Sequence, residues 1–309
     1  MNVCQKVLLY CTHPWKILLS LSARTHLGVR IPMSDKSYLK LLYWDRFKKK
    51  LDLNNPKSFN EKLQWLKLYD RNPEYTNLVD KYEAKKIVSK IIGDKYLIPT
   101  LGVWENFDNI DFDKLPNEFV LKCTHDSGGL VIIKDKSNMD RKLAKKLLVK
   151  ALKRNFFYPG REWPYKNIRP RIIAEKYMST DNSEELNDYK FMCFNGKCEM
   201  CFTCTERFSS DEVKVTFFDL EWNELPFERY HKKSDIHIPK PSKLDEMIHL
   251  AELLAKGIDF VRVDFYEIEG AVYFGEMTFY PGSGLEPFQP EQWDYLIGKK
   301  IVLSNSKGE

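Results

Sequence analysis

VRVDFYEIEGAVYFGEMTFYPGSG, residues 261–284, contains two alternating runs joined by a short turn at Glu269–Gly270, and this pattern predicts a β-hairpin. Alternate side chains share one face of a strand, so Glu276 and Thr278 lie together on the second run. Asp264, on the first run, can face them across the ladder. Two carboxylates and a hydroxyl suit a hard cation such as Mg²⁺ that also holds phosphates. The alternative is an amphipathic hairpin whose acids face water.

The overall composition is that of an ordinary globular protein. The chain has 309 residues, of which 43% are hydrophobic and 30% charged. That length allows one large domain or two or three subdomains. A net charge of +5 and an isoelectric point of about 8.6 are compatible with an anionic partner such as a nucleotide, an acidic sugar or a membrane surface. The excess is too small to predict nucleic-acid binding.

The seven cysteines are odd in number and scattered, which favours a reducing compartment over a disulfide framework. Four of them cluster around a predicted Asn-Gly turn: Cys193, Cys198, Cys201 and Cys204. Cys198 and Cys204 share a strand face, and Cys201 points the other way. We interpret these four as small apolar strand residues, with a metal site as the alternative.

The chain contains no apolar stretch long enough to span a membrane. Its first thirty residues include apolar runs interrupted by His13, Pro14 and Lys16, which is not the pattern of a signal peptide. An amphipathic helix here could pack on the body of the protein or touch a membrane surface. We expect a cytoplasmic protein, with contact at the inner face of the membrane as an open alternative.

Hydrophobic periodicity predicts a helical front followed by a mixed, mostly antiparallel remainder, which is an α+β fold. Ser58 and Glu61 have the spacing of a capping box, and Ser34 is a second candidate cap. Helices are expected over residues 80–92, 140–156 and 243–257, and strands or hairpins over 119–123, 130–135, 171–178, 188–208 and 215–225. The predicted organisation is a helical segment 1–77, a smaller subdomain 78–178 with a glycine loop, and a larger subdomain 179–309 with the metal site.

Charged residues at strand ends suggest an anion-binding cleft. Lys122 ends a hydrophobic strand directly before the glycine-bearing loop THDSGG, an arrangement that can bind phosphate through backbone N–H groups and an ammonium. Asp188 and Lys190 lie two residues apart and share a face, as do Arg262 and Asp264. Surface ion pairs and an exposed hairpin loop would explain the same residues.

Together and in this order, these strings resemble the ATP-grasp superfamily, and within it the TupA-like family of bacterial cell-surface polysaccharide synthesis. The resemblance extends from about residue 35 to the carboxy terminus. The strings that carry it are SFNEKLQWLKLYD (58–70), VLKCTHDSGG (120–129), GREWPYKNI (160–168), IIAEKYM (172–178), DYKFMCFNGK (188–197), RVDFY (262–266) and FGEMTFYPGSGLEPF (274–288).

The resemblance implies roles for individual residues and a fold of two α+β subdomains that clamp ATP. Two lysines would contact the nucleotide phosphates, a glycine loop would close over them, and a hinge strand would take the adenine. Two acids and a hydroxyl would hold Mg²⁺, two ions in most members, although most members have asparagine where Thr278 stands. The residues concerned are as follows: for ATP, Lys81, Lys122, His125, Ser127, Gly128, Gly129, Glu175, Lys176, Tyr177 and Asp188; for the metal, Asp264, Glu276 and Thr278; for catalysis, Lys190 and Arg262; for the acceptor, Pro281, Gly282, Ser283 and Gly284.

The resemblance implies an ATP- and Mg²⁺-dependent carboxylate–amine ligase that works through an acyl phosphate. Its expected substrates are ATP, a carboxylate-bearing sugar or amino acid, and an amine, in capsule, exopolysaccharide or teichuronic-type polymer synthesis. One alternative is a glycosyltransferase, since the aromatic residues between Phe156 and Tyr165 would suit sugar stacking, although no compact Asp-x-Asp motif is present. The other is a non-catalytic binding protein that keeps the fold.

Overall fold

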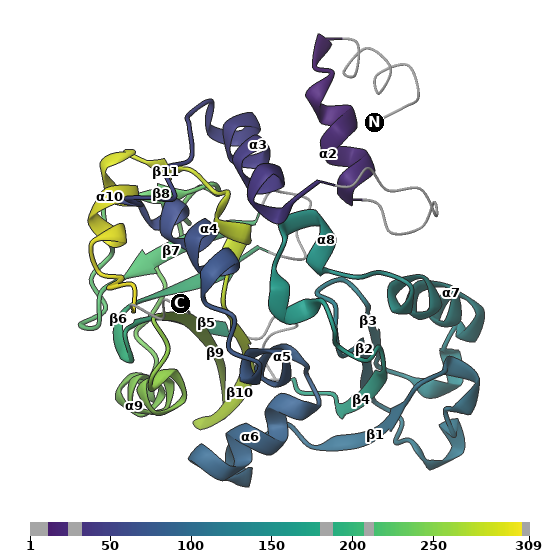
Figure 1. Ribbon diagram of the computed structural model, residues 1–309. Coiled ribbons are helices and arrows are strands. Elements are labelled where there is room, and N and C mark those ends of the chain that lie inside the picture. The colour runs from purple at the N-terminus through teal and green to yellow at the C-terminus, as the bar shows by residue number, and fades with distance from the viewer. Residues whose placement is uncertain (1–11, 24–32, 180–187, 207–212, 305–309) are drawn as a thin grey trace.

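The computed structural model describes residues 12–23, 33–179, 188–206 and 213–304. Two antiparallel sheets stand apart, each with helices packed on it, and further helices join them on one side (Figure 1). The predicted α+β class is therefore confirmed. The expected contribution of residues 1–11 to an amphipathic helix lies outside the described residues.

The smaller sheet has the strand order β1-β4-β2-β3 and is antiparallel throughout. Helix α7 packs on β2 and β3. Phe119, Leu121 and Ala174 are fully buried on the side of the sheet that forms this smaller core. Side chains that alternate with them, including Lys122 and Glu175, lie on the opposite face. Its strands are β1 (Thr100–Trp104), β2 (Phe119–Cys123), β3 (Leu130–Ile133) and β4 (Ile172–Lys176).

The larger sheet has the order β10-β9-β5-β6-β7 and is also antiparallel. Helix α9 packs on β5, β6 and β9 over the larger core. Its strands are β5 (Asp188–Phe194), β6 (Lys197–Thr205), β7 (Lys214–Phe218), β9 (Phe260–Ile268) and β10 (Ala271–Thr278); a short ribbon pairs β8 (Glu228–Arg229) with β11 (Phe288–Gln289).

Helices dominate the described part of the amino-terminal segment, as expected. Ser58 accepts a hydrogen bond from the Glu61 N–H while the Glu61 side chain accepts one from the Ser58 N–H, which confirms the capping box. Ser34 caps its helix in the predicted way. The helices are α2 (Trp15–Ala23), α3 (Asp35–Phe47), α4 (Phe59–Tyr69), α5 (Glu74–Val79), α6 (Glu83–Ile92), α7 (Arg141–Leu152), α8 (Phe157–Gly160), α9 (Leu244–Ala255) and α10 (Gln292–Gly298).

Some predicted element boundaries differ from those of the structure. The helix expected from Asp80 begins at Glu83, because the Asp80 carboxylate accepts hydrogen bonds from the N–H groups of Tyr82 and Glu83 and so caps the helix instead of joining it. Within residues 215–225, where a hairpin is expected, β7 pairs with β6, and the returning chain makes a short antiparallel contact: Phe218 bridges to Glu224, and the Leu225 N–H donates to the Phe217 carbonyl.

The two sheets are linked near both ends of α6, and the chain also passes from β4 of the smaller sheet to β5 of the larger one. Beyond the carboxyl end of α6, Leu97 bridges to Phe274 of the larger sheet, and β1 of the smaller sheet begins at Thr100. At the amino end, Arg171 forms ion pairs with Asp80 and Glu83 immediately before β4. The segment 153–171 between α7 and β4 passes over the larger core, to which Ile168 belongs. The predicted subdomain boundaries stay a prediction, since helices before β1 share the larger core.

Among the described helices, none combines the length and the apolarity that crossing a bilayer requires. Cys193, Cys198 and Cys201 are buried within the larger core, in line with their interpretation as small apolar residues. Within the described ranges, no three histidine, cysteine, aspartate or glutamate side chains converge as a ready-made metal site.

Candidate active site

The β9–β10 hairpin has the geometry that its sequence predicts. Glu269 and Gly270 turn the chain with positive φ angles of 52° and 74°. Asp264 lies opposite Glu276 in the ladder, and Arg262 lies opposite Thr278. The pairing shifts by one residue at Gly275, where an added Cβ would lie 3.1 Å from the Asp264 carbonyl oxygen. The shift is a bulge that sets the two acids directly across from each other.

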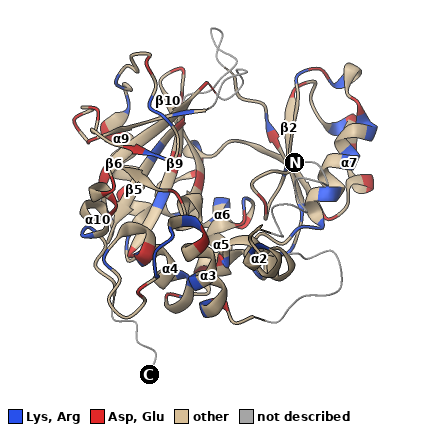
Figure 2. Cartoon of the chain, turned by 90° about the horizontal axis from the view of Figure 1, so that it is seen from above, with Lys and Arg blue, Asp and Glu red and all other residues tan. Residues whose placement is uncertain are grey.

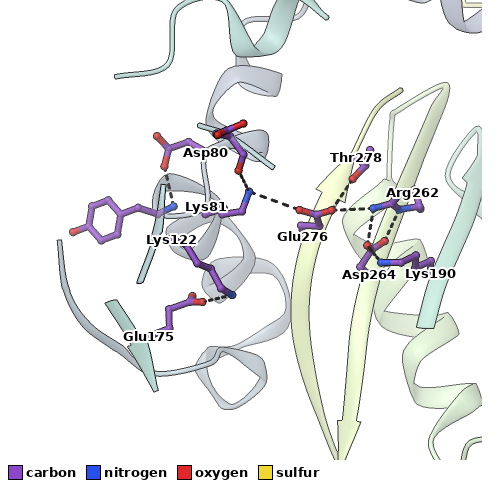
Figure 3. Close-up of polar contacts among 11 residues, drawn as sticks. Asp80, Lys81, Lys122, Glu175, Lys190, Arg262, Asp264, Glu276 and Thr278 are labelled. Carbon is purple, nitrogen blue, oxygen red and sulfur yellow. Dashed lines mark hydrogen bonds and ion pairs between the residues drawn. The ribbon is translucent and has the colours of Figure 1, made fainter. Parts of the chain in front are cut away.

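Asp264 is the centre of a buried ion cluster on this sheet (Figure 3). Its Oδ1 accepts a hydrogen bond of 2.7 Å from Arg262 Nε, and its Oδ2 accepts 2.7 Å bonds from Arg262 Nη2 and Lys190 Nζ. The Lys190 ammonium also lies 2.5 Å from the carboxylate of Asp188, its neighbour on β5. The side chain of Asp264 is only 3% exposed. Arg262 and Lys190 therefore balance the charges of the buried acids Asp188 and Asp264.

Glu276 is the more accessible acid, with a side chain that is 40% exposed. Its Oε1 accepts hydrogen bonds from Arg262 Nη2 at 2.9 Å and Thr278 Oγ1 at 3.3 Å, and its Oε2 lies 3.9 Å from Lys81 Nζ. Burial raises the pKa of Glu276, but Lys81, Arg262 and Lys190 outweigh it and lower the pKa to about 2. The carboxylate is thus ionised throughout the neutral range.

Lys122 and Glu175 form the opposite wall of the site, on the smaller sheet. Lys122 Nζ donates a 2.7 Å hydrogen bond to Glu175 Oε2, and the Lys85 ammonium contacts Glu175 Oε1. Burial raises the pKa of Glu175, but Lys122 and Lys85 reverse the effect and lower it. The Glu175 side chain is therefore engaged by two lysines, and the next two residues of the predicted adenine-binding segment are exposed Lys176 and half-buried Tyr177.

Lys81 connects the glycine loop to the acids. Its backbone N–H donates to the carbonyl of Thr124, and its Nζ donates a 2.9 Å hydrogen bond to the carbonyl of Asp126. The loop itself packs tightly on α7, because a Cβ added to Gly129 would lie 2.7 Å from the Ala151 Cβ. Glycine lets the backbone approach both the helix and the cleft, as the predicted phosphate-binding role requires.

His125, for which an ATP contact is predicted, is buried and does not line the cleft. Its side chain is 3% exposed, and its Nε2 lies 3.2 Å from the Arg154 carbonyl oxygen at the end of α7. Burial lowers the pKa of His125, with the Asp126 carboxylate opposing the change. The ring thus packs behind the loop, whereas Ser127 and Gly129 line the cleft.

One cleft unites the two walls. Segments far apart in sequence form its lysine-rich face and its acidic face, and apolar side chains lie between the two faces. Its lining residues are Lys81, Lys85, Lys122, Asp126, Ser127, Gly129, Leu130, Glu175, Asp188, Lys190, Asp264, Tyr266, Phe274, Gly275 and Glu276. Figure 2 shows charged positions along the larger sheet, which lies across the molecule from β2. The apolar part of the lining comes from Leu130, Tyr266 and Phe274. This surface suits a flat heterocycle that lies between the lysine-rich face and the acidic face.

The turn Pro281–Gly284 lies outside the lining of this cleft and is held by buried side chains. Lys67, fully buried, donates hydrogen bonds of 2.8 Å and 3.0 Å to the carbonyl and hydroxyl oxygens of Ser283. Arg229 Nη2 donates a 2.7 Å bond to the Pro281 carbonyl. Gly282 and Ser283 both have φ angles of 56°. The buried side chains of Lys67 and Arg229 therefore hold the left-handed backbone of the turn in place, while Gly282 remains exposed.

The donor set fits a magnesium ion. Asp264 and Glu276 present carboxylate oxygens from directly paired strand positions, with the Thr278 hydroxyl beside them. Mg²⁺ prefers oxygen ligands and is usually held by one or two carboxylates together with substrate phosphates. Arg262 Nη2 donates a hydrogen bond to each of the two carboxylates, so a positive charge already lies between the two acids.

Sequence reasoning missed several residues of the site. Lys85 pairs with Glu175, and Tyr266 and Phe274 supply apolar lining. A signal existed for Lys85, which follows Lys81 by four residues, the spacing of neighbours on a helix. No spacing in the sequence marks Lys67 as a site residue, because only the folded chain shows that its side chain bonds to the Pro281–Gly284 turn.

Solved structures with related folds are similar over part of their length. The ATP-grasp ligase PsnB with a minimal precursor aligns at 10% identity and a TM-score of 0.39, covering 71% of this chain and 59% of that one. D-Alanine–D-alanine ligase from Bacillus anthracis with ATP aligns at 18% identity and a TM-score of 0.40, covering 74% and 66%. The biotin carboxylase domain of Hydrogenobacter thermophilus 2-oxoglutarate carboxylase aligns at 15% and 0.44, covering 74% and 46%.

This chain spans only 57–59% of the length of the first three matching structures. A search of curated proteins finds no match. A family model gives the decisive comparison: the model of TupA-like ATP-grasp proteins matches residues 61–302, which include the glycine loop, strand β4 and the acidic hairpin. The chain therefore belongs to the TupA-like ATP-grasp family.

Proposed function

We propose that this protein is an ATP- and Mg²⁺-dependent carboxylate–amine ligase. The observation that carries the proposal is the single cleft in which Lys81 and Lys122 face Asp264 and Glu276 from opposite walls. Such a cleft provides positive charge for phosphates and paired carboxylates for a metal ion within one site. Family membership supports the same reading, since the matched residues contain all four side chains.

In this proposal the cationic side chains hold the phosphates of ATP. Lys81, which donates to the Asp126 carbonyl, and Lys122, which donates to Glu175, would contact the triphosphate, and the loop N–H groups around Ser127–Gly129 would approach its oxygens. Mg²⁺ bound by Asp264 and Glu276 would neutralise phosphate charge. Arg262 and Lys190 stabilise the charge that develops on the transferred phosphoryl group, through contacts prepared before the reaction.

The proposed reaction forms an amide in two steps. A carboxylate oxygen of the acceptor attacks the γ-phosphorus, the bond to the β-phosphate oxygen breaks, and an acyl phosphate and ADP result. The nitrogen of an amine then attacks the acyl carbon, and phosphate leaves with the bonding electrons. We place the acceptor near the exposed Gly282 of the Pro281–Gly284 turn, which follows β10 in the chain and is held by Lys67 and Arg229. Positioning supplies much of the rate enhancement in such reactions.

We further propose that the acceptor is a uronic acid or an amino acid of a surface polymer, that the protein acts on the cytoplasmic side, and that it uses two Mg²⁺ ions. These finer assignments rest on the family resemblance. The mildly basic charge of +5 is in keeping with anionic substrates.

The test measures ADP release and captures the acyl phosphate. Purified protein is incubated with Mg-ATP and single uronic or amino acids, and hydroxylamine is supplied as the amine, so that an acyl phosphate gives a hydroxamate. We expect ADP and hydroxamate in equal amounts with one acceptor class. Glu276→Gln removes a proposed metal ligand and abolishes both products. Glu269→Gln makes the same chemical change at the exposed turn of the same hairpin and leaves both intact.

Two other results would redirect the assignment. Thermal stabilisation by UDP-glucose but not by Mg-ATP would indicate the glycosyltransferase alternative. Stabilisation by Mg-ATP with no ADP formed from any acceptor would indicate a binding protein that keeps the fold.

A further inference from the structure

Helix α7 presents an unusual outer face. Residues 141–154 contain seven lysines and arginines and no acid. The face also carries two leucines one helical turn apart, Leu143 and Leu147, which are 52% and 46% exposed. An amphipathic helix normally buries its leucines, and here the buried side already consists of Ala144, Leu148 and Ala151.

The inner face anchors the helix and leaves the outer face uncovered. Ala144, Leu148 and Ala151 pack into the smaller core against β2 and β3. Since Lys122 and Glu175 lie on the opposite face of that sheet, the sheet separates α7 from the cleft. A partner on the outer face of α7 would therefore leave the cleft open. Figure 2 shows α7 at the edge of the molecule with cationic positions along it.

The charges of the outer face are largely free of internal counterions. Lys145 binds Asp108, and Arg154 binds Asp126, so these two are committed to the fold. The remaining exposed lysines project between and beside the leucines, and the described part of the chain gives them no acidic partner within ion-pair distance. They are Lys142, Lys146, Lys150 and Lys153.

We propose that this lysine–leucine face of α7 docks on the anionic headgroups of a membrane. Lysine ammonium groups would contact lipid phosphates and carboxylates, while their alkyl stems and the two leucines enter the boundary between headgroups and acyl chains. A nucleic acid or an acidic polymer would satisfy the charges but would gain nothing from two exposed leucines. The combination of both residue types on one helix face therefore favours a lipid surface. This inference is independent of the proposed reaction.

Binding of the full-length protein to vesicles tests the charge contribution. We expect cosedimentation with phosphatidylcholine vesicles that contain phosphatidylserine, none with phosphatidylcholine alone, and weaker binding as salt increases. Lys142→Glu/Lys146→Glu should weaken binding by about 25-fold or more, since each lysine near an anionic surface contributes about fivefold. Lys36→Glu/Lys40→Glu makes the same charge change at the same spacing on exposed positions of α3, and should change binding less than twofold.

The leucines distinguish a membrane from a soluble polyanion. Leu143→Ala/Leu147→Ala should weaken vesicle binding at least fivefold without changing its salt dependence. Leu253→Ala/Leu296→Ala removes leucines that are 38% and 42% exposed on other helices, and should have no effect. Unchanged thermal stability of each variant shows that the fold persists.

Three outcomes would overturn the proposal. The wild-type protein fails to bind anionic vesicles at low salt; or both lysine pairs weaken binding equally, which indicates net charge alone; or the leucine pair has no effect while heparin competes fully, which indicates an acidic polymer. Loss of vesicle binding in a variant that still binds Mg-ATP separates this surface from the active site.

Discussion

Replacement of the two hairpin acids should have very different consequences for stability. Asp264→Asn leaves Arg262 and Lys190 without the carboxylate that bonds to both at 2.7 Å, in a site where Asp264 is 3% exposed. Removing one partner of a buried ion cluster costs about 3–5 kcal/mol, because the other charges stay buried. We therefore expect Asp264→Asn to lower the free energy of unfolding by that amount.

Glu276→Gln should cost much less. Its pKa falls from 4.5 to about 2, and a shift of that size corresponds to roughly 3 kcal/mol of favourable interaction. However, the side chain is 40% exposed, so water screens its charges and we expect a loss of about 1 kcal/mol. The stabilising contribution is present above pH 4.5 and is lost as pH falls toward 2. The acid limb of the stability profile should therefore be shallower in Glu276→Gln.

Urea denaturation at pH 7 without ligand measures both losses, with Glu269→Gln as the matched control. Thermal denaturation with Mg-ATP then measures binding; saturation at one hundred times the dissociation constant contributes about 2.7 kcal/mol in the wild type. Both acid variants should lose this stabilisation. Equal losses in urea for the two acids, or full Mg-ATP stabilisation of either variant, would refute the reasoning.

Three further changes test other parts of the structure. Gly129→Ala should destabilise the protein by about 1–3 kcal/mol in urea, because its Cβ would lie 2.7 Å from a side chain of α7, whereas Gly128→Ala, with its nearest contact at 3.4 Å, should cost less; equal losses would contradict this. Burial raises the pKa of Asp70 to about 6, so between about pH 4 and pH 6 the folded state holds a proton that the unfolded state has released. The free energy of unfolding should therefore decline as pH rises through this range, and Asp70→Asn should remove that decline. The same decline in urea measurements of the variant would argue against this assignment. Glu175→Gln should lower the free energy of unfolding by about 3 kcal/mol, because Lys85 and Lys122 lose their shared carboxylate. Added Mg-ATP should restore part of that loss. An unchanged free energy of unfolding in urea would show that water solvates the two lysines instead.

Local patterns in the sequence predict much of this structure. The alternation around Glu269–Gly270 specifies both strands of the hairpin and the face shared by Glu276 and Thr278. The Ser58 capping box specifies the start of α4. In each case the interacting groups lie within a few residues of one another, so spacing alone predicts the contact.

Contacts that depend on strand order could not be predicted in the same way. Glu175 meets Lys122 because β4 pairs with β2 rather than with its neighbours in sequence. His125 faces α7 because the glycine loop packs against that helix. The burial of Lys67 depends on a turn more than two hundred residues away, a contact that no local pattern encodes.

Two contacts at opposite ends of α6 tie the sheets together, in addition to the passage of the chain from β4 to β5. One lies beyond the carboxyl end of α6, where Leu97 bridges to the larger sheet, and the other lies at its amino end, where Arg171 binds Asp80 (Figure 1). They are separated by about the length of this ten-residue helix, roughly 15 Å. A change in the angle between the sheets that keeps both contacts is a rotation about the line that joins them. Helix α6 lies along that line, so Lys81, next to it, would move least in such a rotation.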